Sequence, residues 1–158
     1  MTSTAIVWFR RDLRLNDNPA LEQACRQHDR VLPIFVFDPE AEGSWAQGGA
    51  SKWWLHHSLT ALSDSLSKLG SRLVLRQGDS AEILKSMCKQ ANVRAVYWNR
   101  VYEPAFVERD SRLKASLKSL DLDVRSFASS LLFEPWDLLK ADQTPYLVFT
   151  PFWKQMQK

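Results

Sequence analysis

Short apolar runs alternate with longer amphipathic segments along most of this chain. The apolar runs are typical of strands buried on both faces, and they cover residues 5–9, 31–37, 73–75, 95–98 and 124–127. The segments between them repeat their apolar positions every three or four residues, which indicates helices. Strand and helix therefore alternate five times, which predicts a parallel sheet covered on both faces.

The clearest helical pattern is a row of leucines that begins at Leu55 and ends at Leu69, with spacings of four, three, four and three residues. These spacings place the leucines on one helical face. Gly70 follows, as expected for the residue that ends a helix. The preceding residues 39–50 are polar and contain three glycines, which favours a loop.

Several residues mark where the other helices begin. Asn18 followed by Pro19 is a favourable start, because Asn caps the first turn and Pro is already in a helical conformation. Asp79 and Pro104 give two further starts of the same kind. The fold class is therefore α/β, a three-layer α/β/α Rossmann-like domain with a five-stranded parallel sheet and right-handed crossovers.

The composition is that of an ordinary globular protein, with 45% hydrophobic and 25% charged residues. A net charge of +3 permits nucleic-acid binding but does not argue for it. Asp110 and Lys114 are four residues apart, so they are spaced to form an ion pair on the solvent-exposed face of the helix that begins at Pro104. The sequence shows no signal peptide and no run of roughly 20 apolar residues, so we expect a cytoplasmic protein with no membrane partner.

Ligands of an open parallel sheet bind beyond the carboxyl ends of its strands. In this chain those ends lie at residues 10–14, 37–40, 77–79, 99–103 and 128–130. None carries a GxGxxG or GxxxxGK[ST] phosphate-binding pattern, and residues 99–103 contain no glycine. The pattern argues strongly against an NAD enzyme or a P-loop enzyme. It argues less against a free-standing nucleotide-binding domain of the universal-stress or electron-transfer-flavoprotein type.

Catalytic and metal-binding groups are also sparse. The three histidines, His28, His56 and His57, lie in helical segments without partners at metal-ligand spacing. No serine occupies a GxSxG turn. Cys25 and Cys88 are isolated, and we expect both to be buried thiols. We therefore predict no catalytic residues and no metal site in this chain.

The last residues follow a different pattern. Residues 131–158 are aromatic and irregular, and they contain no further strand–helix unit. An apolar tail of this kind needs a surface to pack against. We expect residues 1–130 to form the α/β domain and residues 131–158 to begin a linker toward another domain. The alternative is that the tail folds back on residues 1–130.

Several motifs resemble one known family. The run VWFRRDLRLNDNPAL at residues 7–21 closely resembles the opening of DNA photolyases and cryptochromes. Further matching pieces follow in the family's order: FDP at 37–39, SKWWL at 51–55, WN at 98–99, YEP at 102–104, RD at 109–110, LLFEPW at 131–136 and FTPFW at 149–153. The paired tryptophans at 53–54 and VRSF at 124–127 look most like plant-type cryptochromes and the bacterial photolyases related to them.

The resemblance implies that this chain is the α/β domain that holds an antenna chromophore, which is a folate, a deazaflavin or another flavin. In that family a larger helical domain holds FAD and receives the pyrimidine dimer flipped out of DNA. The resemblance thus implies that the intact protein is a flavoprotein that repairs DNA as a photolyase, a carbon–carbon lyase, or signals in blue light. The helical domain and DNA are the implied partners, and this chain alone is not an enzyme.

We predict that the antenna site lies at the sheet edge. Phe37 and Trp54 would form its walls, and the charged anchors would be Arg10, Arg11, Asp38, Lys52 and Glu103. We expect only one of the adjacent residues Trp53 and Trp54 to face the core.

One departure from the family pattern bears on the choice of chromophore. Where folate-binding bacterial relatives carry an Asn–Glu pair after the Tyr–Glu motif, this chain has Ala105 and Phe106. The departure leaves a deazaflavin, a flavin or a folate bound in another way as candidates.

Overall fold

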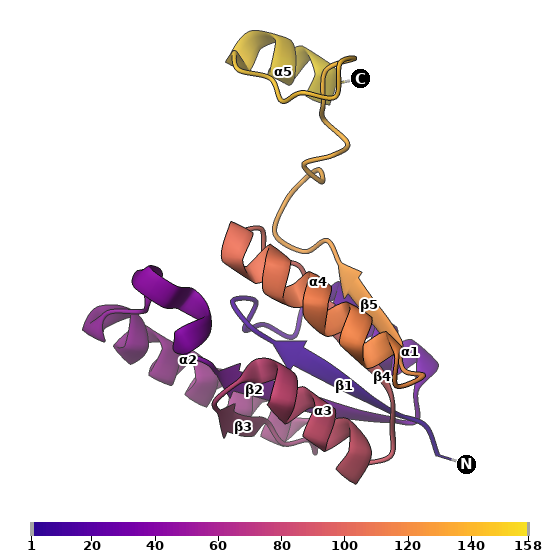
Figure 1. Ribbon diagram of the computed structural model, residues 1–158. Coiled ribbons are helices and arrows are strands. Elements are labelled where there is room, and N and C mark those ends of the chain that lie inside the picture. The colour runs from indigo at the N-terminus through magenta and orange to yellow at the C-terminus, as the bar shows by residue number, and fades with distance from the viewer. Residues whose placement is uncertain (1, 158) are drawn as a thin grey trace.

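Five parallel strands form a single sheet in the order β3-β2-β1-β4-β5 (Figure 1). The computed structural model describes residues 2–157, apart from the side chains of residues 42, 44 and 45. The strands are β1 (Thr4–Phe9), β2 (Arg30–Phe37), β3 (Val74–Gln77), β4 (Val93–Asn99) and β5 (Asp123–Phe127). The predicted five-stranded parallel sheet is confirmed, with small shifts at strand ends.

Helices cover both faces of the sheet (Figure 1). They are α1 (Pro19–Gln27), the short 3-10 helix η1 (Glu40–Trp45), α2 (Gly49–Lys68), α3 (Ser80–Gln90), α4 (Pro104–Lys118) and α5 (Phe149–Met156). Helices α1 and α2 lie against one face, and α3 and α4 lie against the other. The three-layer α/β/α architecture is therefore as predicted.

The core divides into two clusters because successive strand residues point to opposite faces of the sheet. On the central strand, Ile6 and Trp8 face α3 and α4, whereas Val7 and Phe9 face α1 and α2. All four side chains are at most 2% exposed. This double burial explains why β1 is apolar from Ala5 to Phe9.

Local signals fix the helix ends as expected. The side chain of Asn18 accepts a hydrogen bond from the backbone N–H of Leu21, and Asp79 caps α3 in the same way. Gly70 adopts φ +73° after α2, where the N–H groups of Gly70 and Ser71 close a Schellman-type end on α2 carbonyls.

Four expectations on the helices were wrong. Residues 39–50 are not one loop, because η1 and the start of α2 lie within them. Leu69 is 72% exposed because it is the cap residue after α2 rather than part of its buried face. Trp53 and Trp54 are both exposed, so neither faces the core. The thiol of Cys25 is exposed too, and only Cys88 is buried.

The residues after β5 leave the sheet as an extended segment that ends in α5, which stands away from the α/β body (Figure 1). Many of their apolar side chains are exposed, including Leu132, Trp136, Leu147 and Phe149. The part of the tail that includes Leu147 and α5 therefore does not fold back on the body. Among the described residues, no helix is both long enough and apolar enough to span a bilayer.

Candidate functional site

A cavity of about 720 Å³ opens above the carboxyl ends of β1 and β2. Its walls come from the loop after β1, the end of β2, the start of α2, and the β4–α4 region. The main lining residues are Trp8, Arg10, Arg11, Asp12, Phe35, Phe37, Asp38, Gln47, Ser51, Lys52, Trp54, Leu55, Val101, Phe106 and Arg109. The volume lies in the range of pockets that hold a small molecule or cofactor.

Six of the seven residues predicted from the sequence lie around this cavity: Arg10, Arg11, Phe37, Asp38, Lys52 and Trp54. Glu103 is not part of the lining. Its carboxylate instead forms an exposed ion pair with the guanidinium of Arg11 at the mouth. The structure thus brings the seven residues to one edge of the sheet. Glu103 is connected to the cavity only through its ion pair with Arg11.

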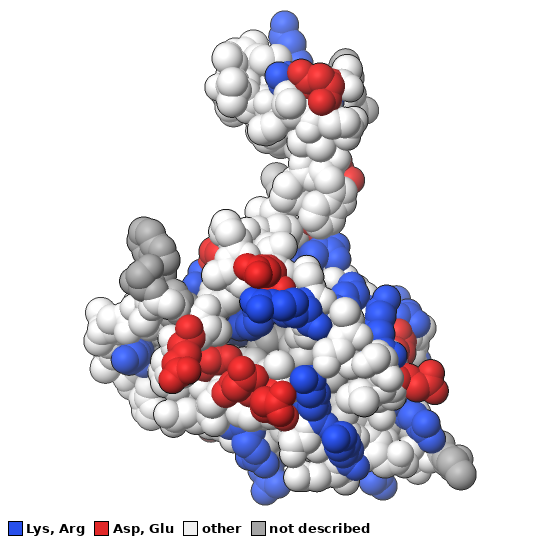
Figure 2. Space-filling view, in the orientation of Figure 1, with Lys and Arg blue, Asp and Glu red and all other residues white. Residues whose placement is uncertain are grey.

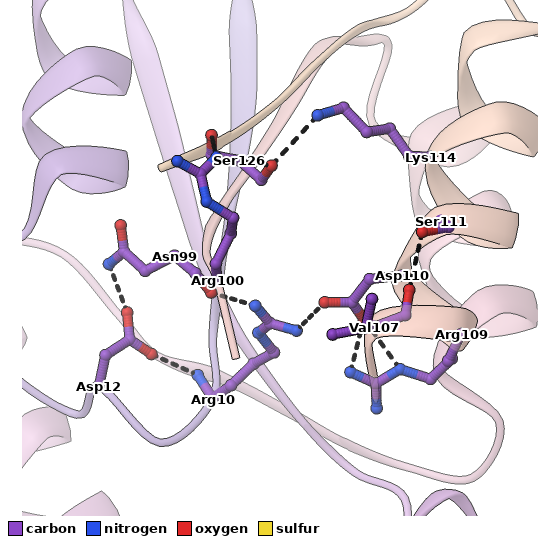
Figure 3. A network of polar contacts seen from close by, with 10 residues as sticks. All are labelled: Arg10, Asp12, Asn99, Arg100, Val107, Arg109, Asp110, Ser111, Lys114 and Ser126. Carbon is purple, nitrogen blue, oxygen red and sulfur yellow. Dashed lines mark hydrogen bonds and ion pairs between the residues drawn. The ribbon is translucent and has the colours of Figure 1, made fainter. Parts of the chain in front are cut away.

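The inner wall is built from Trp8 and two arginines. The two arginines share one carboxylate (Figure 3). Arg10 and Arg109 both bind Asp110, one on each oxygen. Arg10 also donates to the backbone carbonyl of Asn99. Asp110 therefore faces inward to these arginines, and the predicted pair of Asp110 with Lys114 does not form; Lys114 donates to Ser126 instead.

Burial sets the electrostatics of this wall. The Arg10 side chain is 7% exposed, and desolvation lowers its pKa from the ordinary value even though Asp110 acts in the opposite direction.

Figure 2 shows acidic and basic side chains intermingled on the viewed face of the body. The protein therefore presents no uniform field of one sign on that face.

Asp38 helps to build the frame of the cavity. Its carboxylate accepts hydrogen bonds from the backbone N–H and hydroxyl of Ser80 at 2.9 and 2.8 Å and from the N–H of Ala41 at 3.2 Å. These bonds tie the end of β2 to the first turn of α3 and to η1. Arg10 and Asp38 thus shape the cavity through their bonds to other parts of the protein.

The outer wall is more open. Trp54 is 69% exposed and Lys52 is exposed, both in the first turns of α2. Within the described part of the chain, the side-chain ammonium of Lys52 makes no hydrogen bond or ion pair, and the first turn of α2 has no side-chain cap. A helix start of this kind carries partial positive charge. The outer wall thus combines an aromatic face with positive potential.

A second polar cluster fastens the segment after β5 to the end of β4. Glu134 is 9% exposed and accepts hydrogen bonds from Arg100 at 2.7 Å and from the Tyr102 hydroxyl at 3.0 Å. Desolvation and the bond to Glu134 raise the pKa of Tyr102. The guanidinium of Arg100 also lies 5.5 Å from the ring centre of Trp136. The segment after β5 is therefore attached to the α/β body beyond residue 130.

Sequence reasoning missed part of this lining. The sequence patterns place Trp8 in a strand and in a family motif, and they mark Phe106 only as a departure from the folate-binding pattern. Arg109 belonged to a family motif, but its sequence position did not show that it reaches the cavity. The residues 46–48 before α2 were missed as well. The position of Trp8 near the carboxyl end of its strand could have suggested its role, since ligands of a parallel sheet bind beyond those ends.

Among the described residues, no group of three or more His, Cys, Asp and Glu side chains could hold a metal ion. The charged groups of the inner wall are paired with each other.

The sequence model of the DNA photolyase family matches residues 5–158. The chain belongs to this family. A deoxyribodipyrimidine photo-lyase of Agrobacterium fabrum is 45% identical over 99% of this chain and 32% of its own length. Cryptochrome-1 of Arabidopsis thaliana is 40% identical over 96% of this chain and 22% of its own length.

Solved structures of photolyases share the fold. A class III photolyase from Agrobacterium tumefaciens matches with a TM-score of 0.91 and 44% identity, over 99% of this chain and 32% of that protein. An archaeal photolyase from Sulfolobus tokodaii, solved with two FAD molecules, matches with a TM-score of 0.78 and 27% identity, over 96% and 34% of the two chains. This chain therefore spans about a third of these photolyases.

Proposed function

We propose that this chain is the light-harvesting domain of a photolyase or cryptochrome, and that its cavity holds the antenna chromophore. The observation that carries the proposal is the cavity itself. It is large enough for a heteroaromatic cofactor, it has aromatic walls, and its inner charges are paired among themselves. An antenna needs a rigid slot and a few anchors from the protein, and no bond chemistry.

The residues of the outer wall are suited to hold such a pigment. Trp54 and Phe37 offer aromatic faces, and Lys52 offers a charge that is not engaged within the described chain. Arg11 with Glu103 would border the mouth, while Arg10 and Asp38 would hold the surrounding frame. A flavin, a deazaflavin or a folate would each suit this mixture of aromatic and charged groups.

The remaining functions would belong to the intact protein. Its relatives are about three times as long as this chain, which supports a further domain after residue 158. In that domain FAD would use blue light to repair pyrimidine dimers in DNA or to signal. We propose residues 131–158 as the start of the linker. Their exposed apolar side chains, such as Leu147 and Phe149, would then be covered by the second domain. A cytoplasmic location stays a prediction.

Binding measurements test the proposal. The purified chain is titrated with FMN, a deazaflavin and methenyltetrahydrofolate, and fluorescence anisotropy reports binding. Saturable binding of at least one pigment in about the micromolar range is expected for a preformed slot. Calorimetry with ATP and AMP tests the alternative of a nucleotide-binding domain, which the family match does not favour. Tight binding of ATP with no pigment bound would overturn the proposal.

A further inference from the structure

Trp8 occupies an unusual place beside the cavity. It lines the inner wall, yet it is only 2% exposed, and its ring meets the ring of Trp98 edge to face with centres 5.9 Å apart. A tryptophan next to an excited pigment is a liability, since indole is the side chain most readily oxidised by such a molecule. If the excited pigment takes one electron from Trp8, a pigment radical anion and an indole radical cation form. The excitation is then lost.

Two guanidinium groups lie against this indole. Those of Arg10 and Arg109 each lie 4.9 Å from the centre of the Trp8 ring. Asp110 binds both arginines, so the three groups together carry one net positive charge, and the cations make the contacts with the ring. A positive charge left on Trp8 by electron loss would be repelled by both neighbours, strongly so where water is excluded.

The second route to a stable oxidised indole is closed as well. An indole radical cation is stabilised when its N–H passes the proton to a neighbouring acceptor. Within the described part of the chain, the buried Nε1 of Trp8 has no hydrogen-bond partner. Oxidation of Trp8 would thus leave the positive charge on the ring beside the two guanidinium groups.

We propose that Arg10 and Arg109 insulate Trp8 against oxidation, so that a pigment in the cavity keeps its excitation. The functional half of this inference rests on the proposed antenna role, whereas the resistance of Trp8 to oxidation does not. The two arginines would affect the pigment only through their effect on Trp8. Trp54, on the same cavity, has no guanidinium over its ring among the described residues, and it is not insulated.

The chain contains its own reference. Trp98 is 1% exposed against 2% for Trp8 and is in contact with it, although it is not part of the cavity lining. No cation lies over the Trp98 ring in the described structure. Trypsin separates the two tryptophans, because Trp8 lies in residues 1–10 and Trp98 in residues 95–100. The full chain is illuminated with dissolved FMN in air. The excited FMN accepts an electron from tryptophan, and oxygen reoxidises the FMN. Mass spectrometry then quantifies the oxidised form of each peptide.

In the parent chain we expect on the order of tenfold less oxidation at Trp8 than at Trp98. A modest rise in the activation barrier for electron loss from Trp8 gives a difference of this size. Arg109→Gln should move this ratio close to one, and Arg109→Lys, which keeps the charge, should preserve most of it. Thermal melting confirms that each variant is folded, and a variant that fails this check is replaced by Arg109→Met.

Equal oxidation of the two tryptophans in the parent chain, or a ratio unchanged by neutral residues at position 109, would overturn the insulation. The pigment titration above is separate. An insulated Trp8 in a chain that binds no pigment would refute the antenna role and leave the resistance of Trp8 standing.

Discussion

The side-chain amide of Asn99, the last residue of β4, donates to the carboxylate of Asp12 in the loop after β1 at 2.5 Å. The same amide donates to Asn18 at 2.8 Å, and its oxygen accepts the N–H of Ala20 at 3.1 Å. Asn99 is 2% exposed. One buried side chain therefore holds the loop that forms the cavity wall and the first turn of α1 against the central strands.

Replacing this amide should be costly. Asn99→Ala removes three hydrogen bonds and leaves Asp12 and the N–H of Ala20 without these partners, so the free energy of unfolding should fall by about 2 to 4 kcal/mol. Urea denaturation measures the change. Asn16→Ala is the control, because Asn16 is exposed in the same loop and its loss should cost less than about 0.5 kcal/mol. Similar losses in both variants would contradict the role of Asn99.

Glu134 should stabilise the chain far more than an exposed glutamate paired with an arginine does. Glu134→Gln removes the charge that Arg100 and Tyr102 share, and we expect a loss of about 1 to 3 kcal/mol in urea denaturation. Glu22→Gln makes the same change in the exposed pair with Arg26, where about 0 to 0.5 kcal/mol is expected. If Glu134→Gln costs no more than Glu22→Gln, the segment after β5 is not fastened as described.

Two adjacent tryptophans allow a sharp test of the outer wall. Trp54 lines the cavity and Trp53 does not, although their exposures are similar at 69% and 62%. Trp54→Ala should weaken pigment binding about tenfold through the lost aromatic contact, whereas Trp53→Ala should leave it unchanged. Anisotropy titration with the pigment that binds the parent chain measures both. Equal weakening by the two substitutions would refute the placement of the pigment against Trp54.

The two cysteines should differ in reactivity and in their effect on alkaline stability. Burial raises the pKa of the Cys88 thiol to about 11, whereas Cys25 is exposed. A thiol reagent at mildly alkaline pH should therefore label Cys25 and spare Cys88 in the folded chain. A mass spectrum of the labelled protein checks this, and rapid labelling of both would contradict the burial of Cys88.

The same raised pKa predicts how stability depends on pH. The contribution of the neutral Cys88 thiol is fully present below the ordinary pKa of 9.0 and is lost as pH rises toward about 11. The loss should reach about 2 to 3 kcal/mol. Cys88→Ala should remove this part of the alkaline decline in urea denaturation, and Cys25→Ala should not. Identical pH profiles for Cys88→Ala and the parent chain would count against it.

The fold could be predicted from the sequence because its signals are local and agree with one another. The apolar strands, the caps at Asn18 and Asp79 and the stop at Gly70 each act over a few residues. The predicted helix face failed at Leu69 because periodicity continues past the residue where the helix ends. Likewise, spacing alone paired Asp110 with Lys114, since it could not detect Arg10, a hundred residues away along the chain.

The site was less accessible to such reasoning. The rule that ligands lie at the carboxyl edge led to Arg10, Phe37 and Asp38, which do border the cavity. The rule did not say which groups are already engaged inside the protein. The bonds of Asp38 to Ser80 depend on how η1 and α3 pack, and the contact of Arg109 with Trp8 depends on the rotation of α4. Such features arise from tertiary packing.

The direction of the strands has one more consequence. Because β5 runs parallel to β1 and β2, the chain leaves the sheet on the rim where the cavity opens, not on the opposite side. The segment after β5 therefore begins on the same rim as the cavity proposed for the pigment. Energy transfer between dyes falls off steeply with separation, so a domain that follows from this rim would have a shorter path to a pigment in the cavity than one that follows from the opposite rim.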